Sequence, residues 1–412
     1  MVLAALCAAP SAWAASQTWT NAPADAIWLN VNNWINKAVP GAINLTGNSV
    51  NNDTATFNSP VSASGIGSAT MPIALDDATI AGDRSRQIGS IVFDTADCGA
   101  YVFSSPSLAA LPTASTPETG ILNVSHNGSI RLNAAVTNSQ VFLVPILTRL
   151  PSSTDGIYNL VNNATAASAT LFLAAVTNNS SDTRGTTFVL DGTNTGTNTI
   201  ASLSQSPTYT TGISGLRKQG TGTWILSGPN YFRATSPINI WGGTLIVRDA
   251  GAFGAATAAT VSNATLRVEG ATLTQSTLNL KDGGLIQMKG SGIVNGVSVD
   301  GSVANLSMGL ATTSPSDVLT VGNAANKVTG GRSDTVLHVS GPGTVLLSQS
   351  ANYAGTWSLD AGTTQLGDLS ALGTGANVHI GAGATLDLSP LSNVGYPSYS
   401  LTTAGLSAGG TG

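Results

Sequence analysis

The sequence predicts an all-β protein whose chain winds into a parallel β-helix, closed at its N-terminal end by a tryptophan-rich β cap. Three observations lead to this fold class: a sequence block that occurs twice, short alternating segments between turn-forming residues, and a composition that disfavours helices. Repeats built from short strands and glycine indicate a stacked, quasi-one-dimensional architecture. We therefore expect a rod rather than a globule with a single pocket.

The repeated block covers residues 216–270 and recurs at residues 337–389. Its strongest matches are GTGTWILS at 220–227 with GPGTVLLS at 341–348, GGTLIV at 242–247 with AGTTQL at 361–366, and Asn230-Tyr231 with Asn352-Tyr353. Because glycine recurs at fixed intervals while the polar residues between vary, we expect each copy to form stacked rungs of a β-helix.

The composition favours strands and turns over helices. Charged residues make up 8% of the chain and Gly accounts for 47 positions, while the only glutamates are Glu118 and Glu269. Helices rely on Glu, Lys and Arg to cover their solvent faces, so a helical protein is disfavoured. Disorder is the competing interpretation, but 42% hydrophobic residues can bury substantial area.

Short alternating segments predict the individual strands. From about residue 86 onward they occupy four to six residues each, bounded by Gly, Asn or Asp: 88–93, 120–124, 128–132, 187–190, 264–268, 276–280 and 318–321. At about 20 residues per rung and roughly 4.8 Å per stacked strand, residues 86–412 would form a rod of about 80 Å. Residues 191–194 and 196–198 suit corners, whereas 94–117 and 150–163 are expected to be irregular.

The N-terminal part of the chain divides into an expected leader and a cap. Residues 1–14 are apolar and end in Ala-x-Ala, typical of a signal peptide cleaved after Ala14, although an ordinary buried segment is the alternative. Residues 15–85 should hold the cap and the first strands. Trp19, Trp28 and Trp34 would cover the first exposed rung, the rival interpretation being an aromatic platform for sugar rings.

The C-terminal residues 406–412 read as the opening of another rung, so we expect the β-helix of 86–412 to be truncated and a C-terminal anchor or translocator to be missing. The longest apolar run, 166–176, is far shorter than the roughly 20 residues that span a bilayer. Cys7 falls in the expected leader, and Cys98 is interpreted as a small buried apolar residue.

The charge pattern excludes nucleic acid as an expected partner. The net charge is −5, and the densest basic spot is Arg217-Lys218. Binding a phosphate backbone requires clustered Lys and Arg that release counterions.

No residue set stands out as catalytic, cofactor-binding or metal-binding, and we expect none. The three histidines, His126, His338 and His379, lie in separate segments without partners at a recurring spacing. Carboxylates merit a check because lyases with β-helical folds use Asp clusters, but the candidate groups are most simply solvated turn charges: Asp76-Asp77 with Asp83, Arg84 and Arg86, and Lys281-Asp282 near Lys289.

The two blocks resemble the autotransporter-associated β-strand repeat, also called the passenger-associated transport repeat. The first copy matches its pattern at Lys218, Gly220, Gly222, Thr223, Leu226, Ser227, Gly228, Asn230, Tyr231, Gly243, Thr244, Leu245, Phe253 and Gly254. The second copy departs at Val339, Gln349 and Thr364. The resemblance implies a right-handed parallel β-helix exported to the surface of a diderm bacterium.

Three functions remain open at this point. The first is a non-enzymatic stalk or passenger acting in adhesion, envelope structure or matrix formation, with surface glycans or other envelope components as partners. The second is a carbohydrate-active β-helix enzyme or a glycan-binding protein. The third is end-to-end self-association through the open edge of a terminal rung, which is an unpaired strand template.

Overall fold

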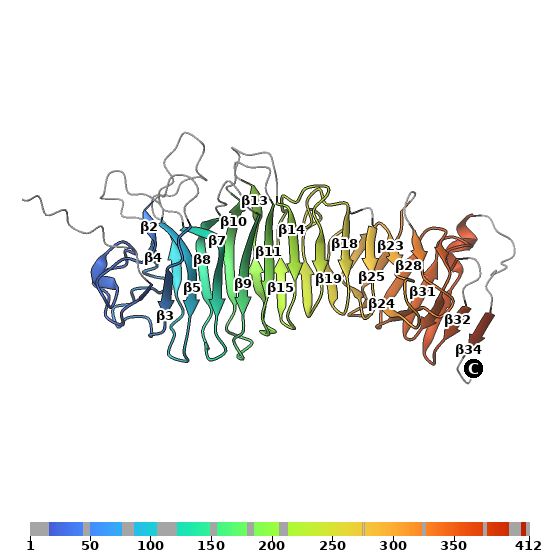
Figure 1. Ribbon diagram of the computed structural model, residues 1–412. Helices are drawn as coiled ribbons and strands as arrows, with labels where there is room; N and C mark the ends of the chain where they lie inside the picture. The colour runs from blue at the N-terminus through green and yellow to red at the C-terminus, as the bar shows by residue number, and fades with distance from the viewer. Residues whose placement is uncertain are drawn as a thin grey trace, which may run out of the picture.

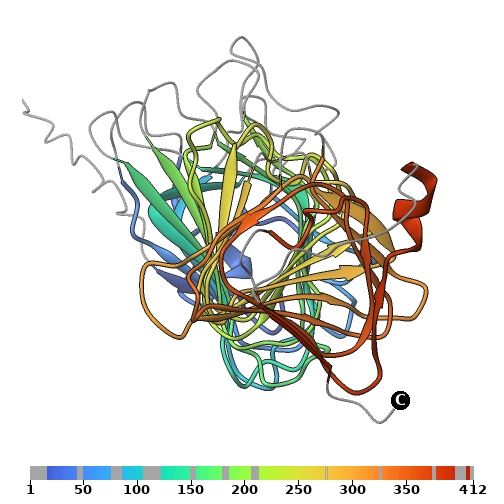
Figure 2. The ribbon, with the colours of Figure 1, turned by 90° about the vertical axis from the view of Figure 1, so that its right-hand side faces the viewer.

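The computed structural model is a single elongated stack of β-strands that advances steadily from the N-terminal to the C-terminal end (Figure 1). Seen along its axis, the coils superpose around a common interior (Figure 2). The structure describes residues 16–43, 50–75, 86–104, 122–148, 155–178, 185–205, 213–273, 275, 277–323, 327–373, 377–394 and 405–408. The expected leader, residues 1–14, lies outside these ranges.

Parallel pairings arrange the strands in three columns, which we name faces A, B and C. Face A contains β1 (Gln17–Thr18), β3 (Thr54–Phe57), β5 (Arg86–Phe93), β7 (Leu122–Leu132), β9 (Gly156–Asn162), β11 (Thr186–Asp191), β14 (Gly215–Lys218), β16 (Ile238–Ile240), β18 (Ala258–Val261), β20 (Thr277–Leu280), β23 (Val297–Val299), β26 (Val328–Gly330) and β29 (Asn352–Tyr353).

Face B contains β4 (Ile73–Ala74), β6 (Val102–Ser104), β8 (Gln140–Thr148), β10 (Leu171–Asn178), β12 (Asn198–Ile200), β15 (Thr223–Leu226), β17 (Thr244–Val247), β19 (Thr265–Glu269), β21 (Leu285–Lys289), β24 (Ser307–Thr312), β27 (Val336–Ser340), β30 (Thr356–Leu359), β32 (Asn377–Ile380) and β34 (Gly405–Ala408).

Face C contains β13 (Leu203–Gln205), β22 (Ser291–Val294), β25 (Val318–Val321), β28 (Thr344–Leu347), β31 (Gly362–Leu366) and β33 (Ala384–Asp387). The first halves of β5 and β7 and the second halves of β8 and β10 also lie on it, because these strands bend around a corner. In the middle coils it shrinks to isolated bridges such as Ile213–Phe232 and Leu273–Val294. The remaining elements are β2 (Ala42–Ile43), which runs antiparallel to β5, and the short 3₁₀ helices η1 (Val31–Asn33) and η2 (Ser389–Val394).

The interior is filled by columns of stacked apolar side chains. On face B, Trp224, Leu245, Leu266 and Ile286 occupy equivalent positions on four successive coils, and each is fully buried. On β19 and β21 the residues that follow, Arg267 and Gln287, are partly exposed, so these two strands show the period of two that alternation in the sequence predicts. On β15 and β17 the residues that follow, Ile225 and Ile246, are buried as well. The parallel β-helix inferred from the repeat is thus confirmed.

The number of residues per coil varies more than the sequence indicated. On face A, one coil takes 39 residues between Ser90 and Ser129, whereas the coil from Thr260 to Asn279 needs roughly half that length of chain. Thirteen face B strands run from β6 to β34, so at ~4.8 Å per step this part of the rod is about 58 Å long. The expectation of about 80 Å was wrong because it assumed a short coil throughout.

Aromatic packing closes the N-terminal end. Trp19, Trp28 and Trp34 are at most 1% exposed, and the Trp34 ring lies 5.1 Å from Trp19 and 4.9 Å from Trp28 between centroids. Phe57 continues the cluster toward Phe93 in the next coil at 5.4 Å. The three indoles form a core that covers the first coils, so they cannot act as an exposed platform for sugars.

Buried asparagines form one corner of the stack, where the sequence suggested turns. Asn162 donates from Nδ2 to Asn198 Oδ1 at 2.6 Å, and Asn198 donates to Asn194 Oδ1 at 3.2 Å. Gly192 adopts a φ of 108°, which a residue with a Cβ adopts only with strain. Because buried amides find partners in neighbouring coils, the ladder fixes their register.

Two segments expected to be irregular are partly regular. Within 94–117, Cys98 and Tyr101 are buried and β6 joins face B. Within 150–163, β9 starts at Gly156 and pairs with β7 and β11. In both segments a strand follows a stretch rich in turn-forming residues, and for that reason the sequence pattern did not predict the strand. In the described part of the chain, no helix is long and apolar enough to cross a bilayer.

Candidate functional surface

The first repeat copy is held together at its corner by a buried lysine. Lys218 ends β14 with no exposed surface, and its ammonium donates to the carbonyls of Gln219, Gly220 and Gly242 at 2.7, 2.9 and 2.8 Å. The Gly242 carbonyl belongs to the coil above, so the side chain ties two coils together. Burial lowers the pKa of Lys218 to about 8, while the nearby Asp191 carboxylate opposes that change.

The second repeat copy sits on different faces of the rod. Strands β14 and β15 of the first copy lie on faces A and B, whereas the equivalent β27 and β28 lie on faces B and C. The pairing of Asn230-Tyr231 with Asn352-Tyr353 was wrong by one residue. Phe232 and Tyr353 occupy the same buried position, while Tyr231 is 65% exposed.

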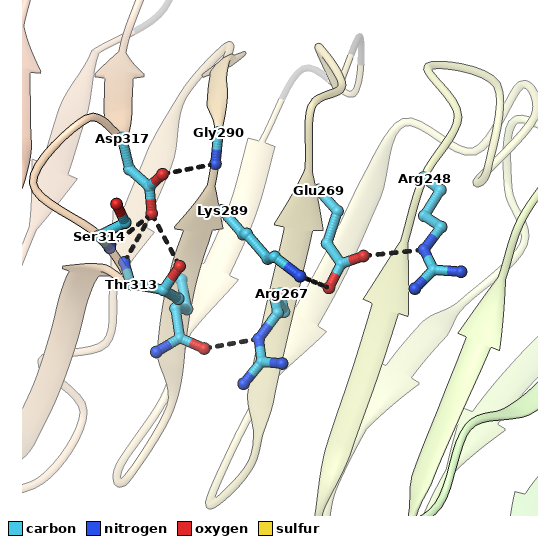
Figure 3. Close-up of polar contacts among 9 residues, drawn as sticks. Arg248, Arg267, Glu269, Lys289, Gly290, Thr313, Ser314 and Asp317 are labelled. Atoms are coloured by element: carbon cyan, nitrogen blue, oxygen red, sulfur yellow. Dashed lines mark hydrogen bonds and ion pairs between the residues drawn. The ribbon is translucent and has the colours of Figure 1, made fainter.

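A row of charged side chains crosses the outer side of face B (Figure 3). Arg248, directly after β17, donates from Nε to Glu269 Oε2 on β19 at 2.8 Å, and Lys289 on β21 approaches Glu269 Oε1 at 3.9 Å. Beside this row, Arg267 donates from Nε to Gln287 Oε1 at 2.7 Å. Each contact joins neighbouring coils, so the side chains are oriented by the stack itself.

Asp317 organises the turn next to this row. Its carboxylate accepts hydrogen bonds from Gly290 N, Thr313 N and Oγ1, and Ser314 N, at 2.7–2.9 Å (Figure 3). Burial raises the pKa of Asp317, but these hydrogen bonds outweigh burial and leave the pKa below its ordinary value. A carboxylate with its oxygens occupied in this way is structural.

Face A carries an exposed aromatic side chain. Trp241, directly after β16, is 46% exposed, and the Arg217 guanidinium lies 5.9 Å from its ring centroid. Arg217 is paired in register with Asn239 of the next coil.

The three histidines lie on three different strands, β7, β27 and β32. His338 Nδ1 lies 2.7 Å from Asp360 Oδ2, but Ser358 Oγ donates to the same Asp360 at 2.6 Å and not to the histidine. In a nucleophile activated by a histidine base, the hydroxyl would donate to the histidine, and here it donates to the aspartate instead. His126 contacts the Asp155 carbonyl at 2.8 Å, and His379 lies on β32.

Of the two charged groups weighed in the sequence, the one around Asp282 does not converge in the described structure. Asp282 accepts from Ser307 N at 3.2 Å, and Lys289 turns to Glu269 instead. The group Asp76, Asp77, Asp83 and Arg84 lies outside the described residues. Across the part of the chain that the structure describes, no three His, Cys, Asp or Glu side chains gather around a possible metal position. Burial raises the pKa of the Cys98 thiol to about 12, so it is an inert core residue.

A family model, described as the passenger-associated-transport-repeat, matches residues 216–247 and 337–366. The chain carries two passenger-associated transport repeats. No curated protein and no solved structure matches the chain. This repeat indicates a secreted passenger segment.

The role of Lys218 in the passenger-associated transport repeat could have been found from spacing alone. Leu216 pairs with Ile238, and the same offset along the chain places Gly242 above Gly220. A basic residue two positions before Gly220 then faces carbonyls from two coils. Of the densest basic spot in the sequence, Arg217-Lys218, the lysine is therefore buried.

Proposed function

We propose that this chain is part of a non-enzymatic surface protein of a diderm bacterium, in which the β-helix is a stiff stalk or passenger. Its role would be adhesion, envelope structure or matrix formation. The observation that carries the proposal is the placement of both passenger-associated transport repeats within one continuous parallel stack. Solenoids of this kind act through extended surfaces rather than through one pocket.

The side-chain arrangement supports a structural role. The polar clusters of the described region mostly join one coil to the next, as Lys218 and Asn198 do. A β-helical enzyme would need several acidic and basic groups converging on one groove. Surface glycans or other envelope components are the partners that we propose, because Trp241 on face A and the charged row on face B are exposed.

Two measurements test the proposal. Antibodies against residues 213–373 should label intact cells that produce the protein, as strongly as permeabilised cells; labelling only after permeabilisation would contradict surface display. The purified chain should release no reducing ends or unsaturated products from acidic or neutral polysaccharides. Turnover, abolished by substitution of an Asp in one outer groove, would instead establish the carbohydrate-active alternative.

A further inference from the structure

Positive charge is concentrated in the middle of an acidic protein. Residues 215–290 hold only three acidic residues, Asp249, Glu269 and Asp282, and carry a formal charge of +4, although the whole chain carries −5. This stretch contains seven of the 15 basic residues: Arg217, Lys218, Arg233, Arg248, Arg267, Lys281 and Lys289. An anion approaching the rod is therefore attracted to the middle coils and repelled by the rest.

Three of these cations line the outer side of face B, and hydrogen bonds orient the two arginines among them. The Arg248 and Lys289 side chains are 43% and 60% exposed, and both contact the single Glu269 carboxylate. Arg267 is oriented by the neutral Gln287 amide. Figure 3 shows both guanidinium groups bonded through Nε, with their terminal nitrogens directed away from these partners.

The balance of charge at this surface leaves it positive even when the Asp317 carboxylate beside the row is included, because three cations face the two carboxylates of Glu269 and Asp317. Glu269 offsets one of its two neighbouring cations, and within the described residues no carboxylate lies within ion-pair distance of Arg267. The paired terminal nitrogens of a guanidinium form a fork that matches a carboxylate. The row thus presents two oriented guanidinium groups and one ammonium group, and the neighbouring carboxylates do not neutralise all three charges.

Spacing identifies the kind of anion that fits. Arg248 and Lys289 lie two coils apart, roughly 10 Å along the rod at ~4.8 Å per coil, with Arg267 on the coil between them. Duplex DNA carries a charge about every 1.7 Å and would extend over the acidic flanking coils. A polymer with one carboxylate per sugar carries fewer charges per unit length than a DNA duplex, so the acidic flanking coils repel it less.

We propose that Arg248, Arg267 and Lys289 form a binding surface for an acidic polysaccharide that carries carboxylate groups. The carboxylates pair with the guanidinium forks and with the lysine ammonium, while the sugar backbone follows the rod. This deepens the surface role proposed above and rests on it, because such polymers are met outside the cell.

The test uses the full chain and probes that differ only in charge. Binding of polygalacturonate is measured by titration calorimetry at low ionic strength, beside its neutral methyl ester and a duplex DNA. We expect polygalacturonate to bind at least about tenfold more tightly than the ester, and affinity to fall as salt is added. Equal binding of acid and ester, no binding of the acid, or tighter binding of DNA would each overturn the proposal.

Variants locate the surface. Arg267→Gln should weaken polygalacturonate binding roughly tenfold, the effect of losing a charge-assisted hydrogen bond. Arg131→Gln, an equal charge change at an exposed position of β7, should change affinity less than about twofold. Gln287→Leu keeps the charge but releases Arg267, and an intermediate loss is expected. Identical losses for Arg267→Gln and Arg131→Gln would mean that net charge alone binds the polymer.

The two proposals fail separately. If polygalacturonate does not bind while antibodies label intact cells, the ligand class is wrong and the surface role stands. If the polymer binds but labelling requires permeabilised cells, the surface role is wrong.

Discussion

The two repeat copies have similar sequences but lie on different faces of the same rod. The first copy puts its two main strands on faces A and B, and the second puts them on faces B and C. The repeat therefore encodes a local strand–corner–strand unit and leaves the choice of face to the coil beneath it. A quasi-one-dimensional stack permits this because each coil contacts only its neighbours.

The coils between the copies show how the change of face is accommodated. From β20 to β26, strands occupy all three faces, and β22 starts a separate five-stranded sheet on face C. Face C has only isolated bridges beside the first copy, whereas it carries regular strands beside the second. The coil from Val297 to Val328 uses a longer stretch of chain than the coil from Leu216 to Ile238, and the extra length allows this change.

At equivalent buried positions, the two copies carry side chains of different polarity. Lys218 in the first copy is replaced by buried Val339 in the second, and buried Asn230 is replaced by Ala351. Each copy buries one indole, at Trp224 or at Trp357, whose N–H donates to a backbone carbonyl. A site can therefore be polar or apolar, provided that every buried donor and acceptor is satisfied.

The largest expected effect comes from removing the lysine of the first copy. Lys218→Met keeps the volume but leaves the carbonyls of Gln219, Gly220 and Gly242 without this donor. We expect the free energy of unfolding to fall by about 3–5 kcal/mol, because three backbone carbonyls lose a charge-assisted hydrogen bond. Urea denaturation followed by circular dichroism measures it.

The second copy supplies the matched control. Val339→Ala at the equivalent position removes only apolar contacts and should cost about 2 kcal/mol. If Lys218→Met costs no more than Val339→Ala, the lysine does not join the coils energetically, and the two copies differ in sequence but not in mechanism.

Glycine corners should be equally essential in both copies, with a smaller effect. Gly220 and Gly341 have φ of 68° and 87°, and a Cβ on either would collide with the backbone of the coil below. Alanine at either should cost about 2–4 kcal/mol in the same urea experiment, from strain plus collision. At Gly270, with φ of 62° and open space around it, alanine should cost only about 1 kcal/mol.

Equal costs at all three glycines would show that backbone strain alone sets the requirement. A large cost at Gly220 with a small one at Gly341 would show that the second copy tolerates a displaced coil. Either result would limit the claim that both copies share one corner geometry.

Much of the fold could be predicted from the sequence because stacking leaves a direct periodic trace. Glycine spacing and alternation located strands such as 187–190 and the corner at Gly192. The face occupied by each copy could not be predicted, since it depends on the summed length of every preceding coil. The row of Arg248, Glu269 and Lys289 was also missed, because its members are distant in the sequence and meet only when coils stack in register.

The smallest expected effect is a pH dependence that only the first copy has. Burial lowers the pKa of Lys218 to about 8, whereas an unfolded lysine has a pKa near ~10.4. Between these values the unfolded chain binds more protons than the folded one, so stability should rise with pH. Cys98 acts oppositely, because burial raises its pKa to about 12 and the unfolded thiol ionises first.

Comparing the protein with its Lys218→Met variant isolates the lysine, because Cys98 is common to both. The stability difference between them should grow by on the order of 1–2 kcal/mol from pH 7 to pH 9.5 in urea titrations. The upper limit stays below the ordinary pKa of tyrosine, since burial raises the pKa of Tyr101, Tyr158 and Tyr353 and would add an opposing change above it. A difference that stays constant across this range would mean that the three carbonyls fully compensate the ammonium for its burial. The lysine of the first copy would then be as insensitive to pH as the valine of the second.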